Sequence, residues 1–387
     1  MLTLIKNADI YAPASIGVGN LLLGGGKVLY AGKELPGVDA AWLGDTLDLQ
    51  GAPVIPGLID CHVHVTGGGG EDGFSTQAPP VQLSRFTRHG VTSVVGLLGT
   101  DDETRSTSGL IARTRALREE GLSAWCWTGG YHVPPTTLTG TVRGDIVNID
   151  CVIGLGELAI SDHRSSQSSF EELARLASEA HVAGLLSRKA GIVHLHLGDG
   201  ERGLSLVRQL LHETELPPRV FHPTHVNRRK DLFEEALELS HNHSVIDVTA
   251  FPVEEGENAW SAADAWERFH DGACPVENLT ISSDGGGCLP VFDENGALVK
   301  MDFATSAGLP DALRELTSRG HGLETVLPAM TSNVSRLLKL AGKGRIEKGY
   351  AADLVCLDEY HRVRHVMARG NWMVQDGSPV VRGMFED

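Results

Sequence analysis

The sequence of 387 residues contains no long hydrophobic run. Its longest apolar stretches, such as TSVVGLLG at residues 92–99, are far shorter than the roughly 20 residues that a helix needs to cross a bilayer. The first residues, MLTLIKNADIYAP, also lack a long apolar core followed by a small-residue cleavage site. No membrane span and no secretory signal peptide are therefore expected.

Positive charge is scarce as well. The chain has 33 Lys and Arg against 50 Asp and Glu, which gives a net charge of −17. This balance argues against nucleic acid or an anionic membrane surface as a partner. The six cysteines are scattered and form no Cys-x-x-Cys pair, so free thiols are expected rather than a disulfide framework. These absences predict a cytoplasmic protein that binds neither nucleic acid nor membranes.

The middle of the chain alternates between apolar β-type runs and helix-like segments. Eight runs in βα alternation predict an α/β fold, a (β/α)8 barrel of the TIM type. In such barrels the chemistry lies at the carboxyl ends of the strands. The runs are residues 58–65, 92–99, 123–131, 151–160, 191–198, 219–226, 244–250 and 279–284.

Both ends of the chain have a different pattern. Residues 1–55 and 344–387 contain short strand-like pieces broken by glycine, which is typical of antiparallel β structure. We expect the two ends to pair into one small discontinuous β-sandwich domain. Residues 56–343 then form the catalytic, metal-dependent (β/α)8 barrel.

Histidines and carboxylates fall near the carboxyl ends of five of the eight runs. His62 and His64 are two residues apart on a strand, so they share one face. Glu157 lies inside an apolar strand, where a carboxylate is costly unless something positive meets it. A lone strand histidine is more often a structural core residue, but five strands that supply such groups together predict a metal centre. The full set is His62, His64, Glu157, His196, His225 and Asp284, a ligand type that suits zinc.

Two pairs of histidines compete for a place at the barrel mouth. His194 and His196 both face inward on the same run, and His222 and His225 lie on the next one. His196 and His225 lie nearer the carboxyl ends, so they are the predicted ligands. His194 is expected to be a deeper structural residue.

A glycine motif offers an alternative site. Residues 198–203 match G-x-G-x-x-G after a strand, the pattern of a dinucleotide-binding turn. Asp199 and Glu201 in this loop would repel a pyrophosphate, so we reject that interpretation. The glycine run at 67–70, directly after the two histidines, is expected to let the backbone approach a bound ligand.

Several longer blocks carry a family resemblance. PGLIDCHVHV after an N-terminal β segment, with single His, His and Asp residues on later strands, resembles the amidohydrolase superfamily. The blocks HVHVTGGGGEDG, TGGYHVP, AISDHRS and PTHVNR resemble, more specifically, the bacterial isoaspartyl (β-aspartyl) dipeptidases. The C-terminal GKGRIEKGYAADLVCLD fits the same family, so the resemblance covers almost the whole chain. It implies a dipeptide substrate, two Zn²⁺ per chain and a homo-oligomer of dimers, up to an octamer.

The resemblance also implies residue roles. His62 and His64 would bind the more buried zinc, Asp284 would complete that site, and His196 and His225 would bind the second zinc. A metal-bridging hydroxide would attack the isopeptide carbon, with Asp284 as general acid and base and Tyr131 as a donor to the oxyanion. Without the resemblance, Glu71 and Arg228 could be solvated loop charges, and Thr100 could simply cap the next helix. The implied substrate-binding residues are Gly69, Glu71, Thr100, Tyr131, Arg164, Arg228 and Cys288.

Two positions depart from the family pattern. The family has a carboxylated lysine that bridges its metals, and Glu157 stands there in a strand that is one residue longer; Cys288 replaces a serine. Because a carboxylate has two oxygens and the charge of a carbamate, we expect Glu157 to bridge both zinc ions without a carboxylated lysine. Alternatively, Glu157 pairs with Arg164 or Arg228 and leaves one metal.

The alternatives to a β-aspartyl dipeptidase are of two kinds. A related amidohydrolase could act on another amide, such as an N-acyl amino acid or a cyclic imide. A non-catalytic scaffold is the other possibility, but such a protein should lack metal ligands. Here only the lysine is missing, and a carboxylate replaces it.

Overall fold

A computed structural model of the chain describes residues 1–292 and 298–386. Each of the eight predicted apolar runs contains a strand, and the first six form one parallel sheet in the order β11-β10-β9-β8-β7-β6. Five of these strands are buried along their whole length, and in β8 only Trp125 is half-buried, as expected of parallel strands covered on both faces. Their bounds are β6 Leu58–Val63, β7 Val91–Gly96, β8 Ser123–Thr128, β9 Val152–Ile160, β10 Ile192–Leu197 and β11 Phe221–Thr224.

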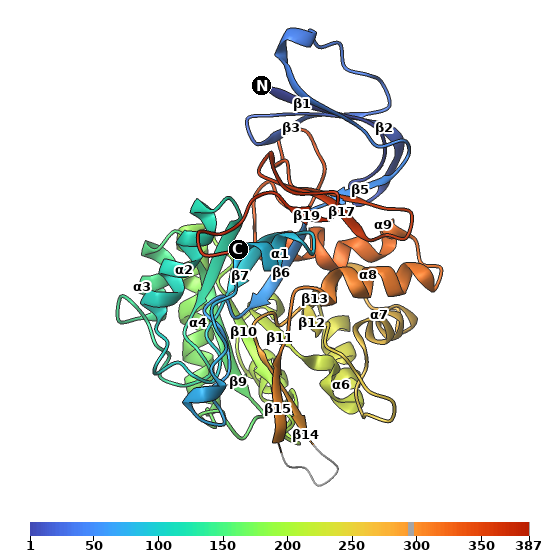
Figure 1. Cartoon of the computed structure of the whole chain (residues 1–387). Helices are drawn as coiled ribbons and strands as arrows, with labels where there is room; N and C mark the ends of the chain where they lie inside the picture. The colour runs from blue at the N-terminus through green and yellow to red at the C-terminus, as the bar shows by residue number, and fades with distance from the viewer. Residues whose placement is uncertain (293–297, 387) are drawn as a thin grey trace.

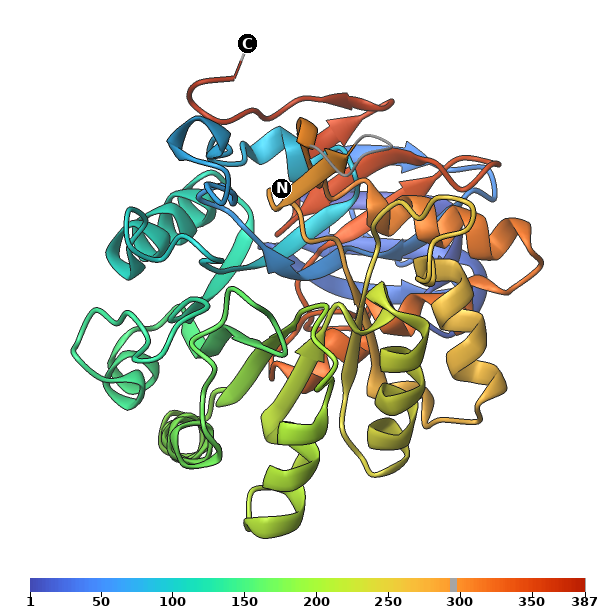
Figure 2. The same ribbon diagram turned by 90° about the horizontal axis from the view of Figure 1, so that it is seen from below.

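The last two predicted runs form a separate parallel pair, β12 (Ile246–Thr249) and β13 (Leu279–Ser282). A single parallel bridge between Val63 and Gly285 links the end of β6 to the residues just after β13. The α/β class and a curled parallel sheet are therefore confirmed (Figure 2). Closure of all eight strands into one barrel stays a prediction.

Helices lie around the outside of the curled sheet (Figure 2). The longest of them, α4, begins at a capping box between Ser169 and Glu172 and turns a row of buried alanines toward the strands. No helix among the described residues is both long enough and apolar enough to cross a membrane. The α-helices are α1 Leu83–Thr87, α2 Thr107–Glu119, α3 Val142–Asn148, α4 Phe170–Ser187, α5 Ser205–Glu213, α6 Lys230–His241, α7 Ala262–Asp271, α8 Gly308–Ser318, α9 Leu323–Val326 and α10 Ser332–Leu337. The 3-10 helices are η1 Ala40–Trp42, η2 Phe74–Thr76, η3 Pro218–Val220, η4 Val226–Arg228, η5 Val276–Asn278 and η6 Leu327–Met330.

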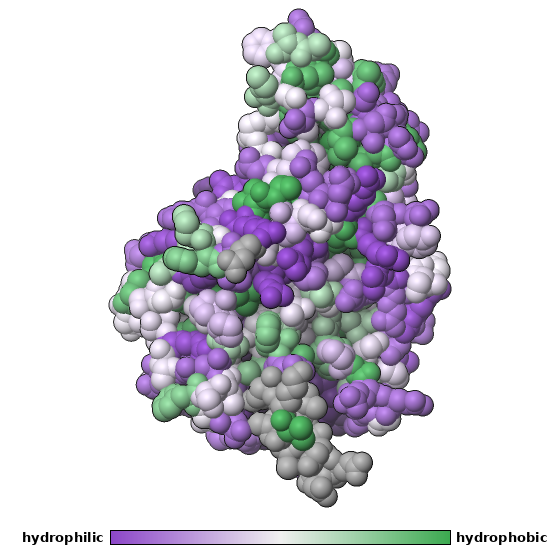
Figure 3. All heavy atoms as spheres, viewed as in Figure 1, coloured by the Kyte–Doolittle hydropathy of each residue, from purple (hydrophilic) through white to green (hydrophobic). Residues whose placement is uncertain are grey.

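The two ends of the chain meet in one sheet of nine strands, at the top of Figure 1. The junction is antiparallel pairing between β5 and β16, with Val355 opposite Ile55. The strands form a single hydrogen-bonded sheet, so the predicted sandwich and its domain limits stay predictions. In Figure 3, apolar side chains gather over this upper part of the molecule. The strands are β1 Leu2–Tyr11, β2 Ser15–Gly24, β3 Lys27–Gly32, β4 Leu43–Asp48, β5 Pro53–Pro56, β16 Leu354–Leu357, β17 Val363–Ala368, β18 Asn371–Gln375 and β19 Ser378–Pro379.

A hairpin follows β13 and was not predicted from the sequence. It consists of β14 (Cys288–Phe292) and β15 (Leu298–Phe303), paired antiparallel. It extends at the end of the molecule opposite to the terminal sheet (Figure 1). This is the end toward which the parallel strands point, so the hairpin lies beside the expected site.

Candidate metal centre

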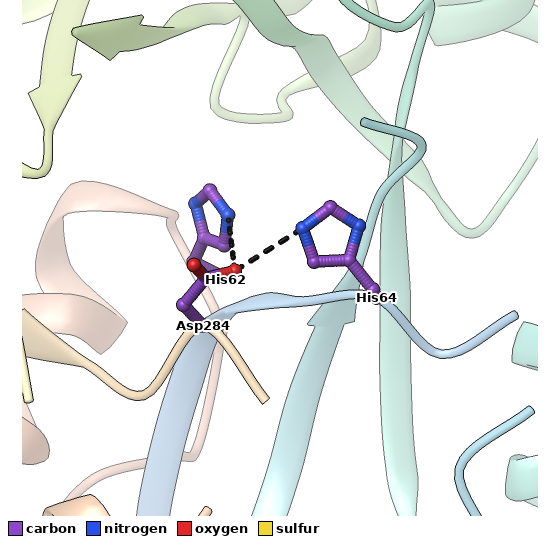
Figure 4. A group of neighbouring side chains, drawn as sticks. All are labelled: His62, His64 and Asp284. Atoms are coloured by element: carbon purple, nitrogen blue, oxygen red, sulfur yellow. Dashed lines mark ion pairs between the residues drawn. The ribbon is translucent and has the colours of Figure 1, made fainter. Parts of the chain in front are cut away.

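Three of the predicted ligands meet where β6 ends (Figure 4). The Nε2 atoms of His62 and His64 lie 3.3 Å and 3.1 Å from the same oxygen, Oδ1 of Asp284. The backbone N–H of His64 donates to the Gly285 carbonyl at 2.8 Å, which ties the strand end to the Asp284 loop. Two imidazoles and a carboxylate within this distance form a set that a divalent cation can bind.

The opposite wall of the site is shaped by a β-bulge in β9. Leu155 pairs with Val193 and Leu158 pairs with Leu195, so Gly156 and Glu157 together face the single residue His194. A Cβ atom at Gly156 would lie 2.7 Å from the Cβ of His194, so only glycine fits there. The extra residue noted in the sequence is therefore accommodated as a bulge, which leaves Glu157 fully buried among the ligands.

Glu157 is surrounded by imidazoles. Its Oε1 lies 3.4 Å from Nε2 of His64. Its Oε2 lies 3.0 Å from Nδ1 of His196 and 3.5 Å from Nε2 of His225 and of His62. Burial alone would raise the pKa of Glu157, but His62 and His196 outweigh it and hold that pKa well below its usual value. The two oxygens thus face different histidines, an arrangement suited to two cations.

The arginines that were the alternative partners of Glu157 have other partners. Arg164 pairs with Asp162 and Glu71, and Arg228 lies 3.3 Å from Oδ1 of Asp199. The ion-pair alternative therefore lacks support in the geometry.

The centre of the site contains buried polar atoms without hydrogen-bond partners. Among the described residues, Nε2 of His62, Oε1 of Glu157 and Oδ1 of Asp284 are such atoms. Buried polar groups are normally paired, because an unpaired group costs its desolvation free energy. Cations would satisfy all three atoms at once, and nitrogen and carboxylate donors suit zinc. The residues present therefore fit a metal centre.

His196 is oriented by a carboxylate that the sequence analysis missed. Its Nδ1 faces Glu157, while its Nε2 lies 3.1 Å from Oδ2 of Asp162. A ligand histidine that donates its second N–H to a carboxylate is fixed in tautomer and orientation. The block AISDHRS contains Asp162, but the sequence analysis took only Arg164 from it as a site residue.

Asp162 also occupies one edge of Arg164. Nε and Nη2 of the guanidinium donate to Asp162 at 3.0 Å and 2.7 Å. Nη1 remains for Glu71, whose Oε1 lies 3.2 Å away and also accepts from the Thr100 hydroxyl. Arg164 can therefore offer a substrate one edge of its guanidinium group rather than the whole group.

Tyr131 lies on the metal side of the cavity. Its hydroxyl is 2.8 Å from Nδ1 of His196, and the Arg164 guanidinium lies 5.3 Å from the centre of its ring. Burial, assisted by the nearby Glu157, raises the pKa of Tyr131 well above its usual value. The phenol therefore keeps its proton at neutral pH and can act as a hydrogen-bond donor.

Gly69 and Cys288 face each other at the rim. Gly69 has φ +80°, and a Cβ atom there would lie 2.3 Å from Sγ of Cys288. Burial and the negative charge of Glu71 raise the pKa of Cys288 to about 11. The group that replaces the family's serine is thus a neutral thiol, a weaker donor than a hydroxyl.

All of the predicted site residues except His62 line one cavity. It has a volume of about 70 Å³, and a groove of about 540 Å³ continues from it past Phe251 and Leu289. His62, His194 and His222 do not line the cavity; His62 contacts His194, and His194 contacts His222. The lining is His64, Gly69, Glu71, Thr100, Tyr131, Glu157, Arg164, His196, His225, Arg228, Asp284, Gly287 and Cys288.

Comparisons with known proteins agree with this architecture. The amidohydrolase family matches residues 54–373. A β-aspartyl dipeptidase from Fervidobacterium islandicum AW-1, solved in complex with a β-Asp-Leu dipeptide, is 40% identical, with 98% of each chain covered and a TM-score of 0.90. A second structure of a β-aspartyl dipeptidase from the same organism is 38% identical over the same coverage, with a TM-score of 0.88.

Among curated relatives the similarity is more local. The imidazolonepropionase of Paraburkholderia phymatum is 35% identical over 111 residues. That match spans 27% of the chain and 27% of the relative's length. It supports the shared family rather than a particular substrate.

Proposed function

This chain belongs to the amidohydrolase family and is a metal-dependent hydrolase, and we propose that it cleaves the isopeptide bond of β-aspartyl dipeptides at a binuclear zinc centre. The observation that carries the proposal is the convergence of two residue sets on one cavity. One set consists of imidazoles and carboxylates that fit cations, and the other consists of Glu71, Arg164 and Arg228. The similarity to two β-aspartyl dipeptidases over 98% of the chain supports it.

The charges of the cavity complement a β-aspartyl dipeptide. Such a dipeptide carries one α-ammonium and two carboxylates close to the scissile amide. Glu71 is a suitable partner for the ammonium, and the guanidinium groups of Arg164 and Arg228 are suitable for the carboxylates. The Arg228 guanidinium donates to the Leu197 carbonyl at 2.5 Å, which holds it at the cavity wall.

The protein residues would divide the chemistry. Two zinc ions, when bound, lower the pKa of water toward neutrality and polarise the amide carbonyl. His62 and His64, whose Nε2 atoms face Oδ1 of Asp284, outweigh the effect of burial and hold the pKa of Asp284 well below its usual range, so it is a carboxylate at neutral pH. Asp284 would accept the proton of the attacking water and pass it to the leaving amine. Tyr131 would donate to the oxyanion.

A substrate panel tests this function. Zinc-loaded enzyme should hydrolyse β-Asp-Leu with a kcat/KM about 100-fold or more above that for α-Asp-Leu, because the α-linked amide is displaced from the reacting position. N-acetyl-leucine and dihydrouracil represent the alternative amide substrates. Faster hydrolysis of either compound than of β-Asp-Leu would contradict the proposal, and no hydrolysis of any of the four would favour a scaffold.

Glu71→Gln tests the ammonium contact. The Glu71 side chain is 25% exposed, so the loss should be near the lower limit for a buried charge pair, about 2 kcal/mol, or roughly 30-fold in kcat/KM. Most of the loss should appear in KM, measured with β-Asp-Leu. The neighbouring Asp72→Asn, an exposed carboxylate outside the cavity lining, should leave both constants unchanged. Unchanged cleavage by Glu71→Gln would remove this role.

We also propose where the enzyme acts in the cell and how it assembles. We expect a cytoplasmic enzyme that forms homo-oligomers built from dimers. Light scattering of the purified protein would give the number of copies.

A further inference from the structure

A line of buried polar side chains leads from the back of His62 through the interior of the molecule. Nδ1 of His62 lies 2.8 Å from Nε2 of His194, and Nδ1 of His194 lies 3.0 Å from Nδ1 of His222. Nε2 of His222 lies 2.9 Å from the Thr280 hydroxyl, which is 2.6 Å from Oδ1 of Asp247. All five residues have 0% exposure. We call them the histidine file.

The file ends at a group that can only accept hydrogen bonds. Asp247 is a buried carboxylate with four donors around it. Its Oδ2 accepts from the hydroxyls of Thr224 at 2.7 Å and Ser282 at 2.5 Å. Its Oδ1 accepts from Thr280 and lies 3.5 Å from the Cys61 thiol. This carboxylate fixes the direction of every hydrogen bond that leads to it.

The direction can be followed from Asp247 to the metal centre. The single Thr280 proton points to Asp247 or to the Ile246 carbonyl at 3.3 Å, so in both cases its oxygen accepts from Nε2–H of His222. Burial lowers the pKa of His222 to about 4, so this imidazole is neutral and its Nδ1 is an acceptor.

The hydrogen bonds of His194, the next imidazole, run in the same direction. Nδ1–H of His194 donates to Nδ1 of His222. When Nε2 of His62 binds a cation, the proton of that ring lies on Nδ1, which faces Nε2 of His194 at 2.8 Å. Nε2 of His194 is then an acceptor, and Nδ1–H of His62 donates to it. The ring of His194 also stacks on Trp127, with centroids 5.1 Å apart, which holds its plane.

We propose that the histidine file, anchored at Asp247, holds His62 in the one tautomer whose Nε2 lone pair faces the more buried cation. His194, His222 and Thr280 are then positioning residues for that ion. The inference rests on the proposed two-zinc centre. Outer partners of ligand histidines commonly change metal affinity by about 10–100-fold. Thr280, three hydrogen bonds away from the ligand His62, would then affect how tightly the metal binds.

Thr280→Val is the direct test, because valine keeps the shape of threonine and removes the hydroxyl. The tighter of the two zinc-binding steps, measured by competition with a chelator, should weaken about 10-fold, the lower end of that range because Thr280 is remote. The other step should stay at the wild-type value. Thr280→Ser restores the hydroxyl and should restore the affinity.

Thr114→Val is the matched control. Thr114 is also fully buried, and its hydroxyl donates to a helix carbonyl, Leu110 O, at 2.8 Å, away from the site. It should bind zinc like the wild type. Wild-type zinc binding by Thr280→Val, or equal weakening in Thr280→Ser, would overturn the inference. Failure of the wild type to bind two zinc ions would instead overturn the proposed centre.

A second measurement follows the histidine tautomers in the wild type itself. Nitrogen-15 NMR of the zinc-loaded, histidine-labelled enzyme should show His194 protonated at Nδ1 and His222 protonated at Nε2. Assignment can use His194→Gln and His222→Gln spectra. The opposite tautomer at His222, or a doubly protonated His194, would overturn the inference even if Thr280→Val did not fold.

Discussion

Glu157→Ala is expected to lose at least one of two zinc ions per chain, and with it nearly all activity, a fall in kcat of about 10³-fold or more. The reason is that Oε1 and Oε2 of Glu157 face different histidines from the bulge in β9. Without this carboxylate, fewer negative charges would balance two cations in a buried site. Zinc content by mass spectrometry and kcat for β-Asp-Leu give the two readouts.

Two comparisons make the Glu157 test specific. Glu171→Ala, on the exposed start of α4, should keep both zinc ions and full activity. Metal-free wild-type enzyme should regain activity with zinc alone, and added bicarbonate should make no difference because no carbamate has to form. Retention of two zinc ions by Glu157→Ala would contradict the bridge.

Tyr131→Phe should lower kcat by about 10²–10³-fold, the effect of losing one oxyanion donor. The Tyr131 phenol stays protonated in its buried position, and it lies beside His196 on the metal side of the cavity. Zinc content should stay at the wild-type level, and KM should change little. Tyr30→Phe in the terminal sheet is the control. A change in KM alone would make Tyr131 a binding residue rather than a transition-state donor.

The parallel strands could be predicted from the sequence because each is buried on both faces and therefore reads as a short apolar run. The β14–β15 hairpin was not predicted, since no strand was expected between the last apolar run and the C-terminal segment. The pairing of β5 with β16 joins residues about 300 positions apart, as Val355 opposite Ile55. Composition suggested β structure at both ends, but it did not indicate one sheet rather than two.

The part of the site that depends only on residue type and on position along a strand could be predicted from the sequence. The ends of parallel strands meet, so His62, His64, His196, His225 and Asp284 were expected together. Asp162 was missed because its contact with His196 depends on a turn after β9 that local pattern does not specify.

The contacts of His194 and His222 could not be predicted from the sequence either. The sequence identified His194 as an inward residue deeper than His196, which agrees with its place behind His62. Its contacts with His222, and through that residue with Thr280, depend on how three different strands lie beside one another. No spacing within one strand carries that information.

The two-metal centre around Glu157 is the claim on which the other roles depend. Anomalous diffraction at the zinc absorption edge, from crystals of the zinc-loaded enzyme, tests it most directly. We expect two peaks about 3.5–4 Å apart, with one oxygen of Glu157 on each ion. A single peak, or a Glu157 side chain that contacts neither ion, would contradict it.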